Sequence, residues 1–103
     1  MNHRNAADME VEVTVLIPRP RRERIEELRQ FYTSTIQGET NPRRAVNALK
    51  NYWFFNLSSG LTEPTEFDRL VEQILDKVLS TDGPVDQNIT MALDALLIRS
   101  QER

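Results

Sequence analysis

Hydrophobic positions along this chain follow two different periods. In residues 10–17, EVEVTVLI, apolar and polar side chains alternate, which predicts a single β-strand that Pro18 and Pro20 would end. After residue 20, apolar residues recur every three or four positions in four successive segments, which predicts four helices. The expected fold is therefore mainly α-helical, with one short N-terminal β-strand followed by four helices.

Turn and capping residues delimit the four helical segments. Thr65 followed three residues later by Asp68 is close to a capping box, and Gly38 fits a helix stop. A turn at residues 82–84 joins the last two segments, which predicts an antiparallel helical hairpin. The expected helices cover residues 20–36, 41–57, 65–80 and 85–100.

The second helical segment, NPRRAVNALKNYWFFNL, holds the only tryptophan and is expected to be the centre of the fold. On a helical wheel its apolar stripe consists of Ala45, Val46, Leu49, Tyr52 and Trp53, with Ala48 and Phe55 on the flank. Phe54 projects from the polar side of this wheel. Either another part of the chain covers Phe54, or Phe54 and Trp53 take part in a subunit interface.

The predicted strand needs a partner, because the backbone N–H and C=O groups of a lone strand would have none. It can pair with its own copy in a homodimer, add to the sheet edge of another protein, or lie across the helices. Val15 and Ile17 share one face of the strand and would be interface residues in the homodimer.

Length and composition predict one globular domain over residues 1–103, since 39% of the residues are hydrophobic and 28% are charged. Residues 1–9 would be a disordered tail, 10–57 a strand-helix-helix unit, 58–64 a connector and 65–103 a helical hairpin. No apolar run approaches the length of a membrane span, and the N-terminus lacks the apolar stretch of a signal peptide. A cytoplasmic protein is therefore expected.

Charge is distributed unevenly along the chain. Residues 1–57 hold nine basic and seven acidic side chains, whereas residues 58–103 hold four basic and nine acidic ones. A basic first half and an acidic second half would orient the protein on a polyanion. The alternative is that both halves are ordinary solvated surface.

Residue types that carry catalysis are scarce. The chain has no cysteine, and its only histidine, His3, lies in the tail, so a Cys or Ser/His nucleophile system is not expected. Its three glycines are isolated, which excludes a glycine-rich phosphate loop. Asp68 with Glu72, and Glu72 with Asp76, are i,i+4 pairs that are expected to be solubilising charge on a polar face. A non-enzymatic protein without a cofactor or metal is expected.

Residues 10–57 resemble the ribbon-helix-helix DNA-binding proteins. The resemblance rests on Val11, Val13, Val15, Ile17 and Pro18, on Ile25 and Leu28, and on the stretch TNPRRAVNAL that opens the second helix. The spacing from Ile17 to Asn41 is similar to that of methionine-repressor-like members. The family implies an obligate homodimer whose paired strands enter the major groove of duplex DNA.

The resemblance also implies roles for individual residues. Thr14 would face the bases, although Glu10 and Glu12 on the same strand face depart from the family's usual residues. The amide of Asn41 and the side chains of Arg43 and Arg44 would bind phosphate. The residues Arg19, Arg21 and Arg22 would form a second basic patch.

Two functions stay open. The first is a dimeric DNA-binding regulator or accessory protein of ribbon-helix-helix type, with the C-terminal hairpin used for oligomerisation or partner binding. The alternative is a small helical protein-interaction module, such as an adaptor, an assembly subunit or an inhibitor, that uses the strand edge or the hairpin. The basic patch favours the first function, and the acidic strand face favours the second.

Overall fold

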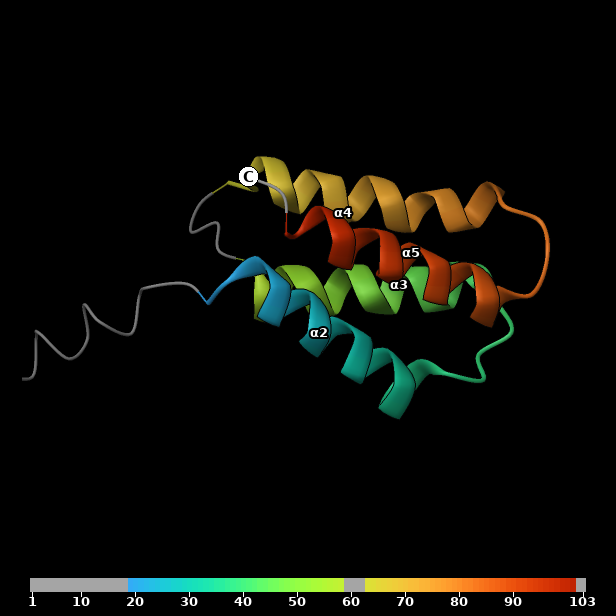
Figure 1. The fold of residues 1–103 in the computed structure, drawn as a ribbon. Coiled ribbons are helices and arrows are strands. Elements are labelled where there is room, and N and C mark those ends of the chain that lie inside the picture. Colours follow the sequence, from blue (N-terminus) through green and yellow to red (C-terminus); the bar gives the residue numbers. More distant parts are fainter. Residues whose placement is uncertain (1–18, 59–62, 102–103) are drawn as a thin grey trace, which may run out of the picture.

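The computed structural model describes residues 19–58 and 63–101, and within them the chain is mainly helical (Figure 1). The helices are α2 (Arg21–Phe31), α3 (Pro42–Tyr52), α4 (Glu66–Asp76) and α5 (Val85–Arg99). Short turns of other helix types extend the first three: two π-helical turns, Tyr32–Ile36 and Trp53–Leu57, and a 3₁₀ turn, Lys77–Ser80. The four expected helices are confirmed. The strand expected at residues 10–17 lies outside the described residues.

The helices form an antiparallel four-helix bundle. Figure 1 shows α2 and α4 running in one direction and α3 and α5 in the other. Helix α2 packs against α3 and α5, and helix α4 packs against the same two helices, so each helix has two neighbours. Short connections between successive antiparallel helices produce this arrangement. The last two helices lie side by side across the turn that contains Gly83, which adopts a φ of 108°.

All four helices contribute to one hydrophobic core. Its fully buried large side chains include Trp53, Leu49, Leu75, Ile89 and Leu96, which come from α3 and its π turn, α4 and α5. The rest of the core consists of Ile25, Leu28, Tyr32, Ala45, Val46, Leu57, Phe67, Val71, Val78, Ala92 and Leu93. The apolar stripe expected on the second helix faces this core, because its period of three to four residues matches the α-helix.

The end of the second helical segment departs from the expected wheel. Trp53–Leu57 is a π turn, in which the Ser58 N–H donates to the Trp53 carbonyl five residues earlier, at 2.8 Å. A π turn holds more residues than an α turn, so each residue rotates the chain by a smaller angle about the helix axis. The side chains beyond Trp53 therefore point in other directions than an α-helical wheel predicts. Phe54 is therefore half-buried against the core, whereas Phe55 is 82% exposed. The α-helical wheel had predicted the opposite, with Phe55 beside the apolar stripe and Phe54 on the polar side.

The side chain of Asp68 is fully buried at the junction of α3 and α4. Its carboxylate accepts hydrogen bonds from Trp53 Nε1 at 2.8 Å, Ser58 Oγ at 2.7 Å and the Thr65 N–H at 2.9 Å. Burial favours a raised pKa for Asp68, but these hydrogen bonds outweigh it and hold the pKa below its ordinary value. The expectation that Asp68 is solubilising surface charge is wrong, because the capping box with Thr65 turns this carboxylate inward.

Arg24 is the second buried charged residue, and it extends this polar junction to α2. Its Nε donates to the Arg19 carbonyl at 3.0 Å and its Nη1 donates to the Leu57 carbonyl at 3.1 Å. The guanidinium also lies over the Trp53 ring, 5.4 Å from the ring centre. Burial lowers the pKa of Arg24. We call Asp68, Trp53, Ser58, Thr65 and Arg24 together the Asp68 hub.

Replacing Asp68 with alanine is expected to lower the free energy of unfolding by about 3 kcal/mol, because three hydrogen-bond donors would lose their acceptor in a buried place. The measurement is urea denaturation of both proteins. Asp82→Ala, in the exposed turn between α4 and α5, is the control and should change the free energy of unfolding by less than about 0.5 kcal/mol. A loss of the same size in both variants would contradict the proposed importance of the hub.

The stabilisation by Asp68 should also depend on pH. Because the folded-state pKa lies below the ordinary value of 3.8, the stabilisation is complete above that pH and is lost as the pH falls through the folded-state pKa. The difference in stability between the natural chain and Asp68→Ala should shrink in that acidic range.

Candidate functional site

The expected DNA contacts do not form one surface in the described residues. Arg19, Arg21 and Arg22 lie where α2 begins, whereas Asn41 and Arg43 lie where the antiparallel helix α3 begins. Figure 1 shows these two helix starts at opposite ends of the bundle. Since α2 and its π turn hold sixteen residues at about 1.5 Å each, the two basic groups are separated by roughly 24 Å. Thr14, the expected base contact, lies outside the described residues.

Side chains at the start of α2 are engaged within the chain. Arg19 forms an ion pair with Glu27 at 2.6 Å, and Arg22 forms one with Glu26 at 3.5 Å. The guanidinium of Arg21 lies over the Phe67 ring, 4.8 Å from its centre. The net positive charge of the expected second patch is therefore reduced by neighbouring carboxylates.

At the start of α3, the backbone amides are already hydrogen-bonded. Asn41 Oδ1 accepts from the N–H groups of Arg43 at 2.9 Å and Arg44 at 3.4 Å. The Asn41 N–H donates to the Glu39 carboxylate at 3.0 Å. The expectation that these amides are free to bind a phosphate is corrected, because Asn41 is the N-cap of α3 and Glu39 occupies its amide. The side chains of Arg43 and Arg44 are exposed, without an ion pair among the described residues.

The expected interface residues have different positions. Trp53 was expected at a subunit interface, but it is fully buried in the core of its own chain and presents no side-chain surface to a second chain. Phe54 packs in part against the same core, in agreement with the expectation that the chain itself covers it. Val15 and Ile17 lie outside the described residues.

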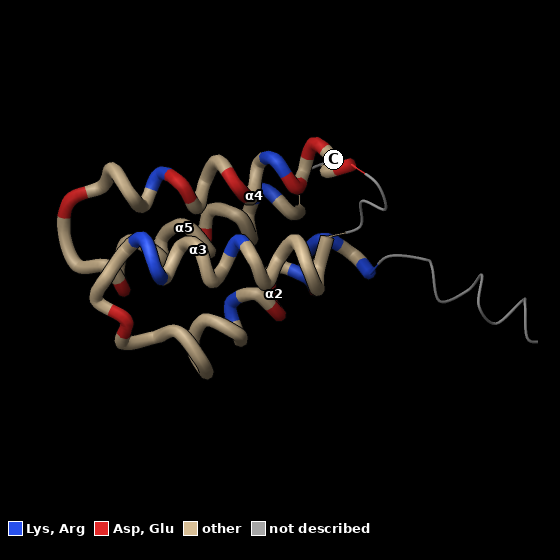
Figure 2. The backbone as a smooth tube through the Cα atoms, turned by 180° about the vertical axis from the view of Figure 1, so that it is seen from behind, with Lys and Arg blue, Asp and Glu red and all other residues tan. Residues whose placement is uncertain are grey.

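Acidic side chains on α4 make contacts between helices. Lys50 of α3 forms ion pairs with Asp76 at 2.9 Å and Glu72 at 3.6 Å. The hydrogen bond to Asp76 raises the pKa of Lys50. Figure 2 shows only basic positions among the charges of α3, whereas α4 carries both signs. Glu72 and Asp76 therefore have a pairing role beside their contribution to solubility.

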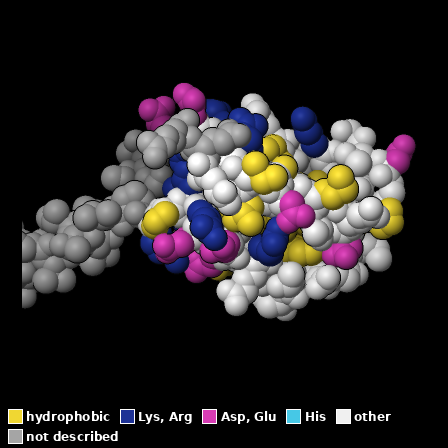
Figure 3. Space-filling view, in the orientation of Figure 1, with side chains coloured by type: hydrophobic (Ala, Val, Ile, Leu, Met, Phe, Trp, Pro, Cys, Tyr) yellow, Lys and Arg dark blue, Asp and Glu magenta, His cyan; other side chains and the backbone are white. Residues whose placement is uncertain are grey.

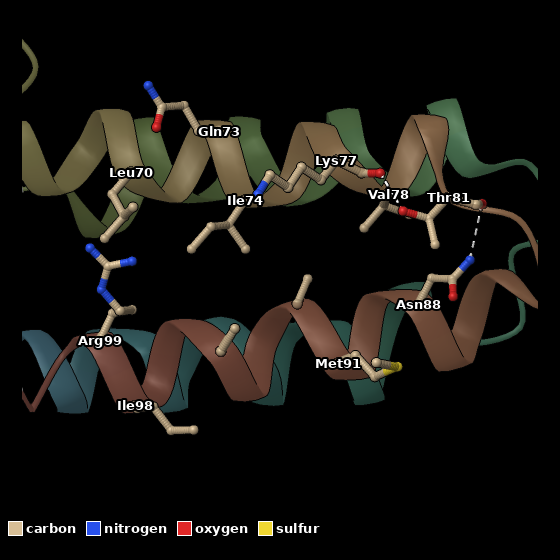
Figure 4. A pocket seen from close by; sticks show the side chains of 12 residues that line it. Leu70, Gln73, Ile74, Lys77, Val78, Thr81, Asn88, Met91, Ile98 and Arg99 are labelled. Atoms are coloured by element: carbon tan, nitrogen blue, oxygen red, sulfur yellow. Dashed lines mark hydrogen bonds between the residues drawn. The ribbon is translucent and has the colours of Figure 1, made fainter.

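An apolar groove lies on the outer face of α4 and α5, with α2 and α3 behind it (Figure 4). Its volume is about 720 Å³. The apolar lining consists of Leu70, Ile74 and Val78 from the α4 segment and Met91, Ala92, Ala95 and Ile98 from α5. The polar lining consists of Gln73, Lys77, Thr81, Asn88 and Arg99. We call this feature the α4–α5 groove.

Two large apolar side chains of the α4–α5 groove are exposed: Met91 at 62% and Ile98 at 64%. Figure 3 shows apolar side chains at the surface on this side of the molecule, with basic side chains next to them. The sequence contains a signal for this groove beside the apolar stripe that predicts the core of α5. Met91, Ala95 and Ile98 follow a helical period beside the core stripe of α5, so this helix has two apolar faces.

No protein-family model matches the chain, and no curated protein or solved structure matches it either. The helices in the described part of the chain are too short or too polar to cross a membrane. In the same residues, no cluster of three or more acidic or histidine side chains is placed to hold a metal ion.

Asn41→Ala is expected to lower the free energy of unfolding by about 1 kcal/mol, because α3 would lose the side-chain acceptor at its N-terminus. Thermal or urea denaturation measures this change. Asn47→Ala, at an exposed position inside the same helix, is the matched control and should be neutral or slightly stabilising. Equal effects of the two substitutions would show that Asn41 does not act as a cap.

Proposed function

We propose that this chain is a small protein-interaction module whose α4–α5 groove binds an apolar segment of a partner protein. The observation that carries this proposal is the exposure of Met91 and Ile98 within a groove that already has apolar walls. Contiguous exposed apolar surface with a polar rim is typical of protein-binding sites. Because about two-thirds of each side chain is exposed, full burial by a partner would contribute about 1–2 kcal/mol per side chain.

The groove has rigid ends, which limits the entropy lost on binding. At one end, Thr81 Oγ1 donates to the Lys77 carbonyl at 2.6 Å, and Asn88 Nδ2 donates to the Thr81 carbonyl at 3.2 Å (Figure 4). At the other end, the Asp68 hub fixes the start of α4 against α3. The α4 wall is therefore held at both ends before a partner arrives, and the Asn88 hydrogen bond joins α5 to it at one of them.

The proposal can be tested by placing a photo-crosslinking amino acid at position 91 of the full chain in its own cells. Position 91 should give an adduct with one partner protein, because its side chain lines the groove and is exposed there. Position 90 on the same helix is exposed but does not line the groove, and the same probe there should not give that adduct. An adduct only within the chain, or with a second copy of it, would contradict binding of another protein.

Purified partner identified in this way should then bind the natural chain and the Thr90→Glu control with similar affinity. Met91→Glu and Ile98→Glu should each weaken binding by at least about tenfold, since a carboxylate in an apolar contact costs more than 1.4 kcal/mol. Circular dichroism checks that the variants keep their helices. Unchanged affinity in both groove variants would place the binding site elsewhere.

DNA binding of ribbon-helix-helix type is the second candidate function. The observation that favours it is that Arg43 and Arg44 are exposed on a helix that carries no acidic side chain. In such a protein the chain would be a homodimer, and the arginines would contact phosphates without reading sequence.

This second candidate predicts that Arg43→Ala weakens binding to mixed-sequence duplex DNA and lowers the slope of log affinity against log salt by about one unit. Fluorescence anisotropy at two or more salt concentrations measures the slope, and the mass is determined on the same sample. Lys77→Ala, on the α4 segment, serves as the control for loss of one positive charge. A slope that falls equally in both variants, or no binding at low salt, would exclude Arg43 as a specific phosphate contact.

A further inference from the structure

A second hollow continues the α4–α5 groove at the end where α4 begins. It has a volume of about 440 Å³ and shares Leu70, Gln73 and Arg99 with the groove. Three arginines from three different helices line it: Arg21 of α2, Arg69 of α4 and Arg99 of α5. Among its lining residues, Glu66 is the one acidic side chain. We call it the three-arginine hollow.

This part of the surface is basic although the part of the sequence that forms most of it is acidic. Residues 58–103 contain nine acidic and only four basic residues. Three of those four, Arg69, Lys77 and Arg99, line the groove or the hollow. The site is therefore a basic surface on the acidic half of a chain whose net charge is −3.

Arginine side chains predominate among the charged residues that line the hollow. Stacking over Phe67 at 4.8 Å holds Arg21 at the hollow. Arg69 is exposed, without an ion pair among the described residues. In Figure 4 the side chain of Arg99 extends from α5 toward Leu70 on α4. An arginine can bind a carboxylate through two parallel hydrogen bonds, which a lysine cannot do.

The shape of the adjoining groove favours a helix as its occupant. Its walls repeat with a helical period, Leu70, Ile74 and Val78 on one side and Met91, Ala95 and Ile98 on the other. From residue 70 to residue 81 the groove wall extends about 16 Å, or three helical turns. The small side chains of Ala92 and Ala95 allow a third helix to approach to the usual 8–10 Å between axes.

We propose, on the basis of the function proposed above, that the partner segment is an amphipathic helix that carries acidic residues at one end. Its apolar stripe lies in the α4–α5 groove, and its carboxylates lie in the three-arginine hollow. The apolar contacts supply most of the affinity. The arginines fix the direction of the helix and reject partners that carry basic residues at that end.

The test uses the full chain and three labelled helical peptides of about 18 residues, long enough to cover the groove. The peptides share one apolar stripe and differ only at three residues at one end, which are Glu, Gln or Lys. Fluorescence anisotropy at low and high salt gives the affinities. The Glu peptide should bind at least about tenfold more tightly than the Gln peptide at low salt, and the Lys peptide should bind most weakly.

Variants of the chain assign this preference to the hollow. Arg69→Glu, at an exposed position, should remove the preference for the Glu peptide and improve binding of the Lys peptide. Arg43→Glu, at the start of α3 and so at the opposite end of the bundle, makes the same charge change and should leave the order of the three peptides unchanged. Circular dichroism of both variants checks folding.

The outcomes separate this inference from the proposed function. Equal affinities for the three peptides, with binding abolished in Met91→Glu, would overturn the acidic-helix proposal and leave the groove as an interaction site. Binding of none of the peptides at either salt concentration, while the cross-linked partner still binds through Met91, would also overturn it. Absence of both peptide and partner binding would overturn the proposed function as well.

Discussion

The fold depends on a buried carboxylate that has no positive partner at hydrogen-bond distance among the described residues. Asp68 is stabilised by three donors from the segment that links α3 to α4, and the Arg24 guanidinium over the Trp53 ring adds a more distant favourable charge. Such a buried charge is tolerated only where its hydrogen bonds are satisfied. The hub therefore requires α2, α3 and α4 to meet in one arrangement. Apolar packing alone would specify this arrangement of the helices less well.

The same hub has consequences for the surface of the bundle. It fixes the first turn of α4, and the first turn of α4 carries Arg69 and precedes Leu70. The position of these two residues determines where the α4–α5 groove meets the three-arginine hollow. A polar cluster in the interior thus determines the geometry of a binding surface, although its own members do not contact the proposed partner.

Much of the architecture could be predicted from the sequence, because the four apolar stripes and their capping residues are local signals. The π turn after α3 could not be predicted, because a helical wheel assumes a constant angle per residue. The wheel therefore assigned the exposed position to Phe54 and the position beside the core to Phe55, the reverse of the structure. The burial of Asp68 was missed because a carboxylate at a helix start usually remains exposed at the cap. The groove was missed because only the core stripe of α5 was traced, although the spacing of Met91, Ala95 and Ile98 marks a second apolar face of this helix. The three-arginine hollow joins residues from three helices, and only the tertiary structure brings them together.

Trp53 is the only tryptophan of the chain, and this gives the bundle a single indole fluorophore at its structural centre. The indole is shielded from solvent, donates one hydrogen bond to a carboxylate and has a guanidinium over its ring. Its emission therefore reports on one defined environment and not on an average of several. Because that environment is the meeting point of α2, α3 and α4, a spectral shift would reveal the separation of these helices even while most of the helical backbone persists.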